Sequence, residues 1–232
     1  MRRGFIVLAV ALFALLFAGI AVDYAERNSL SPLAEGYVER VPQELGAANI
    51  ITGILLTYRG FDTLGEVAVL FMVAAGVGLV LSDRGPRPRD VGSAEPETRA
   101  ASSELVQNGA AGLFPLISIF AAYIVMNGHL SAGGGFQGGA IIASGVMLLL
   151  LAKPEYRIHH GFLGTTESLA GVLFVLAGIA GLMFAGGFLD NRILPLGRFG
   201  AFFSAGAIPI LSVLLGVKVG CELSVIADRF RG

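Results

Sequence analysis

Long apolar blocks, separated by short polar stretches, dominate the pattern of this chain. A helix that crosses the hydrocarbon core of a bilayer needs about 20 mainly apolar residues. Lipid offers the backbone no hydrogen-bond partners, so such blocks are expected to be helical. The windows that meet or approach this length are residues 4–22, 62–82, 109–127, 136–152, 162–186 and 199–221. The pattern predicts an all-α, polytopic membrane protein with about six transmembrane helices.

Two further segments interrupt this pattern. The run LGAANIITGILLTY at 45–58 is apolar but too short to span a bilayer, and charged residues flank it. We expect a short helix there that lies at the membrane interface or packs against the bundle. Residues 83–106 are charged and rich in proline and serine, as is typical of a linker. We therefore expect a two-helix membrane domain (1–82), a cytoplasmic linker (83–106) and a four-helix membrane domain (107–232).

Composition supports a membrane protein and argues against several other classes. Hydrophobic residues make up 55% of the chain and charged residues 14%, against about 25% charged in ordinary globular domains. The net charge of −1 provides no basic surplus for nucleic acid. One cysteine excludes a disulfide framework, and three histidines argue against a structural zinc centre. We expect no catalytic site, metal site or bound cofactor in this chain.

The first window follows Arg2 and Arg3, which is also how a signal peptide begins. Its apolar run is longer than the usual signal-peptide core of about 7–15 residues, and a polytopic sequence follows, which favours a retained anchor. With the N-terminus inside, the cytoplasmic segments hold more Lys and Arg than the outer ones. This distribution predicts that both termini face the cytoplasm.

A glycine-rich stretch, NGHLSAGGGFQGGAI at 127–141, connects two of the apolar windows. It lacks the Gly-Lys-Ser/Thr ending of a nucleotide-binding loop, and no strand precedes it, so a phosphate site is not expected. Glycine permits positive φ and close approach of helices. The pattern favours a tight structural turn, and contact with an ion or substrate through His129 remains open. The glycines assigned to this turn are Gly133, Gly134, Gly135, Gly138 and Gly139.

Five charged residues lie close to or inside the predicted spans. Asp62 and Glu66 share one helical face near the start of the second window, where Asp62 is placed to cap and Arg59 is a possible partner for Glu66. Glu167 lies just inside the fifth window and faces either the interface or a protein interior. Lys218 and Glu222 are four residues apart in the last window. They either snorkel to the interface or form an intramembrane pair on a proton path. Pro209 predicts a kink in that helix.

Three stretches of this sequence are similar to a known family. GHLSAGGGFQGG and GRFGAFFSAGAIPILSVLLGVKVGCELS (197–224) resemble the B subunit of Mrp-type, or Mnh-type, multisubunit Na+/H+ antiporters, which corresponds to the F subunit of membrane-bound hydrogenases. ANIITGILLTYRGFDTLGEVAVLF (48–71) resembles the E-type subunit, which in many antiporters forms the C-terminal end of the large A subunit. The linker then marks the junction of an E–B fusion. Ala132 stands where the family's loop usually has proline.

The resemblance implies a small, multi-pass subunit in the cytoplasmic membrane of a prokaryote, surrounded by lipid. Its expected partners are A- and D-like pumping subunits, C-, F- and G-like small subunits, and possible hydrogenase-like redox subunits. The expected transported ions are Na+ and H+. The residues expected to contribute to ion passage or subunit contacts are Asp62, Glu66, His129, Glu167, Lys218 and Glu222.

Three function classes follow from this resemblance. The first is a subunit of a stand-alone antiporter. The second is the same module within a redox-driven complex of the membrane-bound hydrogenase or formate hydrogenlyase type, which the E–B fusion slightly favours. The third is a purely structural scaffold subunit with no ion path of its own.

Overall fold

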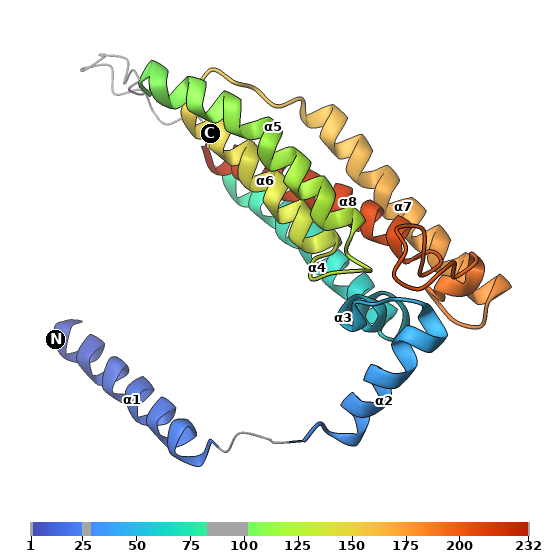
Figure 1. The fold of residues 1–232 in the computed structure, drawn as a ribbon. Coiled ribbons are helices and arrows are strands. Elements are labelled where there is room, and N and C mark those ends of the chain that lie inside the picture. The colour runs from blue at the N-terminus through green and yellow to red at the C-terminus, as the bar shows by residue number, and fades with distance from the viewer. Residues whose placement is uncertain (1, 25–28, 83–101, 232) are drawn as a thin grey trace, which may run out of the picture. The chain divides into compact units, whose positions relative to one another are not determined.

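The computed structural model describes residues 2–24, 29–82 and 102–231, and in this part the chain is helical apart from its connecting loops (Figure 1). The structure divides into two units, residues 1–36 and 37–232, and each is described by itself. Among the described residues, six helices are long and apolar enough to cross a membrane, as the sequence pattern predicted. The predicted linker at 83–106 lies outside the described residues up to position 101.

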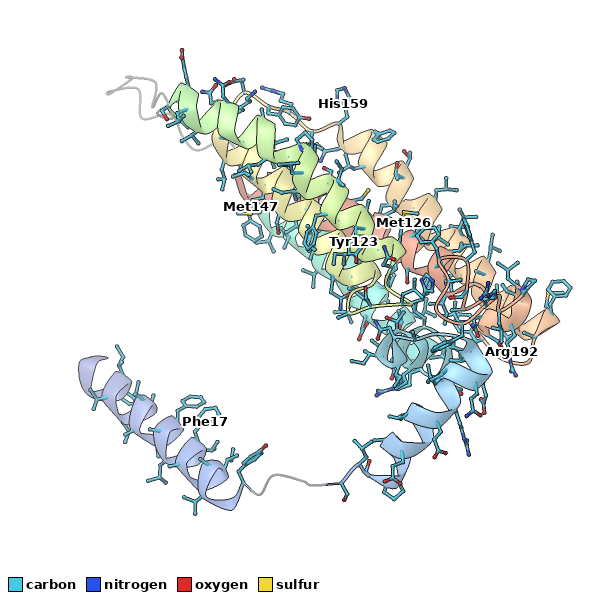
Figure 2. All side chains as sticks on the ribbon, in the orientation of Figure 1. Phe17, Tyr123, Met126, Met147, His159 and Arg192 are labelled. Carbon is cyan, nitrogen blue, oxygen red and sulfur yellow. The ribbon has the colours of Figure 1, made fainter. Side chains whose placement is uncertain are left out.

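The first unit contains α1 (Arg2–Asp23) and the beginning of α2 (Pro32–Arg40). From residue 4 to 22 the side chains of α1 are exposed on all sides of the helix, as Phe17 illustrates in Figure 2. Its span from Gly4 to Val22 is apolar all round rather than amphipathic. Such a helix is compatible with a surround of lipid.

The second unit is a bundle of five long helices: α4 (Gly60–Ser82), α5 (Glu104–Met126), α6 (Gly135–Ala152), α7 (His160–Phe184) and α8 (Ile208–Arg231). The last helix is central, because α4, α5, α6 and α7 all pack against it. Half of its span is buried, against 6% of the span of α4. Glycines allow this close packing. A Cβ atom at Gly139, for example, would lie 2.8 Å from the carbonyl oxygen of Gly216.

The predicted starting point of the last span, residue 199, was wrong. Residues 199–207 form turns rather than helix, with positive φ at Gly200, Ala205 and Gly206, and α8 begins only at Ile208. Pro209 therefore occupies the first helical turn, where its missing N–H leaves no hydrogen bond unmade, and the predicted kink loses its physical basis. The proline that lies inside a helix is instead Pro115 of α5.

The segment 45–58, predicted as one short helix, contains α3 (Ile50–Gly53) followed directly by the π-helix η2 (Ile54–Tyr58). A further π-helix, η1 (Val41–Leu45), precedes the segment and shares only Leu45 with it. Gly46, with φ of 68°, ends η1, and Asn49 caps α3 by accepting from the backbone N–H of Thr52. The segment packs against the bundle, which was the second alternative. The buried apolar residues of η1 and this segment share one hydrophobic core with α4, α8 and the loop before α8; they are Val41, Leu45, Ala47 and Leu56.

Candidate functional site

Three charged side chains meet inside the bundle between α7 and α8. Lys218 and Glu222 form an ion pair within α8, and the ammonium of Lys218 lies 3.5 Å from a carboxylate oxygen of Glu167 on α7. The side chains of Lys218, Glu222 and Glu167 are 8%, 0% and 15% exposed, in that order. We refer to Glu167, Lys218 and Glu222 as the buried triad. Of the alternatives open for these residues, the structure places all three in the protein interior.

Helix geometry and a small neighbour explain how the triad forms. Residues 218 and 222 are one turn apart on the same face of α8. On α7, Gly171 lies beside the stem of Lys218, where a Cβ would be in ordinary van der Waals contact, 3.5 Å from the Cε atom of the lysine. Phe71 of α4 places its ring centroid 5.8 Å from the lysine nitrogen, and this contact shields the ammonium with an aromatic face. Three helices thus enclose the cation.

The charges of the triad do not balance when all three groups are ionised. Two carboxylates share one ammonium, which leaves one excess negative charge in the interior. The second carboxylate oxygen of Glu222, Oε2, is buried and has no hydrogen-bond partner in the described part of the chain. A buried unpaired charge is costly, so this arrangement favours the uptake of one proton or one monovalent cation.

The two acidic residues of α4 lie elsewhere, on the surface of this chain. Asp62 forms an exposed ion pair with Arg59, and the two side chains are 49% and 60% exposed. Arg59 therefore pairs with Asp62, where the sequence suggested Glu66. Glu66 is exposed and lies at the edge of a small pocket of about 60 Å³. Other polar groups around this pocket come from Thr52, Thr63, Gln137 and Ser212.

His129 lies at the end of the bundle where the loops meet, and it is fully buried. Neither ring nitrogen makes a hydrogen bond of normal geometry within the described residues. Burial lowers the pKa of this imidazole from its ordinary value of 6.5, while the nearby carbonyls of Ala201, Phe202 and Met126 act in the opposite direction. The backbone carbonyl of His129 accepts a hydrogen bond of 2.9 Å from the N–H of Asn49.

The glycine-rich loop makes a tight connection into α6. Gly133 and Gly134 have φ angles of 149° and 141°, which a residue with a Cβ rarely adopts. Gly135 then brings α6 against α8, where an added Cβ would lie 2.6 Å from the carbonyl oxygen of Ser212. This geometry favours a structural role for these glycines, with His129 held within the loop rather than exposed to a ligand.

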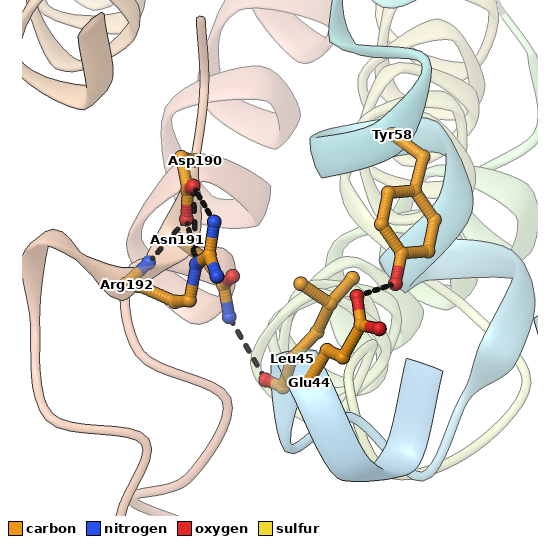
Figure 3. Close-up of polar contacts among 6 residues, drawn as sticks. All are labelled: Glu44, Leu45, Tyr58, Asp190, Asn191 and Arg192. Carbon is orange, nitrogen blue, oxygen red and sulfur yellow. Dashed lines mark hydrogen bonds and ion pairs between the residues drawn. The ribbon is translucent and has the colours of Figure 1, made fainter. Parts of the chain in front are cut away.

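The structure also brings together polar residues that sequence reasoning did not select. Asn191 is fully buried and donates a hydrogen bond of 2.8 Å to the carbonyl of Leu45 (Figure 3). It donates a second bond of 2.8 Å to the carbonyl of Ala205. Asn49 joins α3 to the glycine-rich loop through the carbonyls of Gly128 and Ser131. A lone asparagine within an apolar stretch was the available signal for Asn49, whereas Asn191 stands between Asp190 and Arg192 and gave no such signal.

A charged cluster surrounds Asn191. The hydroxyl of Tyr58 donates to Glu44 at 2.6 Å, and Arg192 pairs with Asp190 (Figure 3). Burial, followed by the bond to Glu44, raises the pKa of Tyr58 to about 12. The hydrogen bond from Arg192 lowers the pKa of Asp190. Each of these pairs lies within one segment, and the bond from Asn191 to Leu45 connects the segment 41–58 with the loop after α7.

One ion pair at the other end of α7 was missed as well. The side chain of His160 is 52% exposed, and its Nε2 atom lies 2.9 Å from Asp228 of α8. Among the described residues, no group of three or more His, Cys, Asp or Glu side chains is placed to hold a metal ion.

Both the N-terminal and the C-terminal part of the chain match a known protein family. Residues 105–225 match the family described as a domain related to the MnhB subunit of Na+/H+ antiporters. Residues 1–98 match the MbhE family, the E-type subunits of MBH. These matches confirm the resemblance that the sequence motifs indicated.

Two solved structures resemble this chain over nearly its full length. One is a chain of the membrane-bound sulfane sulfur reductase, an archaeal respiratory membrane complex, with 36% identity and a TM-score of 0.80. That match covers 99% of this chain and 97% of the other. The second is a chain of the Mrp complex from Dietzia sp. DQ12-45-1b, with 25% identity and a TM-score of 0.77. That match covers all of this chain but only 26% of the Dietzia chain.

A curated relative supports the same relationship. An uncharacterised protein of Methanocaldococcus jannaschii is 29% identical over 199 residues, which cover 77% of this chain and 75% of that protein. The chain is thus homologous to subunits of Mrp-type antiporters and of membrane-bound respiratory complexes, which are multisubunit assemblies. It belongs to the family with a domain related to the MnhB subunit of Na+/H+ antiporters, joined here to an N-terminal part of the MbhE family.

Proposed function

We propose that this chain is a small membrane subunit of an Mrp-type ion-transport module and that its buried triad holds a proton on the transport path. The observation that carries the proposal is the unbalanced charge of Glu167, Lys218 and Glu222 in the bundle interior. Ionisable residues inside membrane bundles are costly and are typical of proton and ion paths. A scaffold subunit would have no need of a buried site with one excess charge.

Protonation of one triad carboxylate makes the site neutral, and loss of that proton restores the excess charge. A nearby Na+ on a partner subunit would favour release of the proton, because two added positive charges at one place repel each other. Coupling of this kind requires no large movement of the chain. His129, Asp62 and Glu66 are assigned to contacts with neighbouring segments or subunits rather than to the proton site itself.

A redox-driven complex is the setting that we favour for this module. The match to a chain of an archaeal respiratory complex covers 97% of that chain, so a separate polypeptide of the same extent occurs there. In the Mrp structure the matching region is about a quarter of a much longer chain. The stand-alone antiporter and the scaffold remain the alternatives. The chain's expected partners are antiporter-type subunits together with redox subunits.

The test is the substitution Glu222→Gln in the assembled complex, with Glu155→Gln in the exposed loop after α6 as the matched control. The amide keeps the size of the side chain but neither accepts nor releases a proton. We expect normal amounts of complex and a fall of about 100-fold in proton movement across inverted vesicles, the lower end of the range for a positioned proton carrier. Unchanged proton movement in Glu222→Gln would support the scaffold instead.

Purification through a tag on this chain, followed by mass spectrometry of all co-purifying subunits, separates the two ion-transport settings. Iron–sulfur or other redox subunits in stoichiometric amounts are expected for the redox-driven complex. Antiporter subunits alone would indicate the stand-alone antiporter.

A further inference from the structure

An apolar groove of about 450 Å³ runs along the bundle between α5 and α7, with α6 and α8 forming its base. Along α8 it extends from Val213 to Ser224, which corresponds to about 16 Å at 1.5 Å per residue. Its opening includes Met126, Val213 and Val217, which are 43%, 39% and 38% exposed. None of the triad residues lines this groove.

The glycines in the base of the groove already pack closely against other helices of this chain. A Cβ at Gly138 would lie 2.1 Å from the Cγ2 atom of Val125, and one at Gly220 would lie 2.5 Å from Ile142. They bring α5, α6 and α8 together and so do not form a free stripe for a further helix. With its small residues used in this way, a narrow apolar groove about 16 Å long is suited to a flexible hydrocarbon chain.

One end of the groove lies beside a basic surface. Leu163, in the first turn of α7, and Ser224 of α8 line that end. The loop between α6 and α7 is tied to the end of α8, because Arg231 donates to the carbonyls of Leu150, Pro154 and Tyr156. Within this region Arg231 pairs with Asp228 and Arg229 donates to the carbonyl of Ala74 on α4. Lys153 and Arg157 of the loop are therefore the cations that face a ligand, with Glu155 as the acidic residue between them. Basic clusters beside membrane helices attract anionic lipid headgroups.

We propose that this groove is a binding site for an anionic phospholipid. One acyl chain lies along α8 from Ser224 towards Val213, and the phosphate group contacts the basic loop at Lys153 and Arg157. The lipid fills the space between α5 and α7 and connects the two helices. This site is independent of the proposed ion path, and its failure would leave the triad untouched.

The test uses the complex isolated through a tag on this chain, in mixed micelles that contain phosphatidylglycerol and phosphatidylcholine with identical acyl chains. Native mass spectrometry then counts each lipid on this subunit. We expect about fivefold preference for phosphatidylglycerol, the contribution of roughly one basic residue near a headgroup. Arg157→Gln should remove that preference, whereas Arg198→Gln, an exposed arginine beyond the other end of α7, should leave it unchanged.

The acyl chain is tested by filling the groove. Ala122 is exposed and lines it, so Ala122→Phe should occupy the space of the chain and remove most of the bound lipid. Ala111→Phe, at an exposed position of the same helix away from the groove, is the matched control. Val217→Phe provides a second groove-filling variant on α8 should Ala122→Phe fail to assemble.

Three results would overturn the proposal. They are equal binding of the two lipids to the unmodified chain, full lipid retention in the groove-filling variants, and a cross-link from Ala122→Cys to a helix of a neighbouring subunit. The last result would show that a protein partner occupies the groove.

Discussion

The acidic residues of this chain fall into two groups with opposite environments. Glu167 and Glu222 are buried around Lys218 in the bundle, whereas Asp62 and Glu66 lie on the exposed face of α4. The sequence places both groups near the ends of predicted spans and gives no reason to separate them. The first group finds its cation, Lys218, within this chain. In the second group, Asp62 pairs with Arg59 at the surface, and Glu66 is left to water or a neighbouring subunit.

The different burial of the two groups predicts how much stability the chain loses when each group is changed. Disturbing the buried triad should have the largest effect, because a charge that loses its partner in the interior cannot be solvated. Disturbing the surface acids should have the smallest effect on the chain and act mainly through the complex.

Lys218→Met should destabilise the chain by about 3–5 kcal/mol, the usual consequence of removing one partner from a buried ion pair. The methionine fits the space of the lysine stem but leaves two carboxylates without a cation. The measurement is the free energy of unfolding in detergent, with Lys153→Met in the loop after α6 as control. A loss below about 1 kcal/mol would mean that the triad is open to water.

A second substitution tests whether the stability lost in Lys218→Met is caused by the lost charge rather than by the changed shape. Adding Glu222→Gln to Lys218→Met removes one of the unpaired carboxylates, so the double variant should recover part of the lost stability. Recovery is expected only if Lys218 and Glu222 interact directly. Additive losses would show that methionine destabilises the bundle by shape alone.

His129 is also buried, but unlike the acidic residues of the triad it has no ionic partner among the described residues. Burial lowers its pKa in the folded chain, so at pH values below about 6.5 the unfolded chain binds a proton that the folded chain does not. Stability should therefore fall as the pH drops through this range, by up to about 1.4 kcal/mol per pH unit, and level off below the folded pKa.

The measurement for His129 is thermal unfolding between pH 5 and pH 8. His129→Gln should flatten the pH dependence, and the exposed His159, at the start of α7 (Figure 2), should show no such effect in His159→Gln. An unchanged profile in His129→Gln would mean that another group titrates.

The hydrophobic pattern of the sequence was sufficient to predict which segments form membrane-spanning helices. It was not sufficient to predict where the last helix begins or what each helix packs against. Apolar windows located six spans because membrane helices carry a strong and local signal. The last window failed at 199–207, where buried apolar residues such as Ala205 and Ala207 belong to turns rather than helix. Hydropathy measures transfer to an apolar medium, and a loop packed against a protein core satisfies that measure as well as a helix does.

The charged residues show a second limit. The spacing of Lys218 and Glu222 placed them on one face of a helix, but it could not say whether that face meets lipid headgroups or α7. Glu167 joins them from 51 positions away, so its role depends on tertiary packing. His160 and Asp228 pair in the same long-range manner, which explains why both were missed.

Asp62→Asn should lower stability only slightly, by about 0.2–1 kcal/mol, because its ion pair with Arg59 is exposed to the surroundings. The effect should disappear at high salt if water reaches the pair. Unfolding free energies at low and high ionic strength provide the measurement, and Arg59→Gln should give a similar small loss. A salt-independent loss above about 2 kcal/mol would place this pair in a dry environment.

Glu66→Gln should have the smallest effect on the isolated chain, within about 0.5 kcal/mol, since the carboxylate is exposed and makes no ion pair among the described contacts. In the complex the same change should weaken assembly or transport, because a carboxylate one turn inside a span is retained at a cost only where a partner or water path compensates it. The measurements are unfolding of the purified chain and the yield and activity of the complex. A lower yield or activity of the complex with unchanged stability of the purified chain would indicate that Glu66 contacts a neighbouring subunit. A loss of stability in the purified chain as well would indicate that Glu66 is buried within this chain.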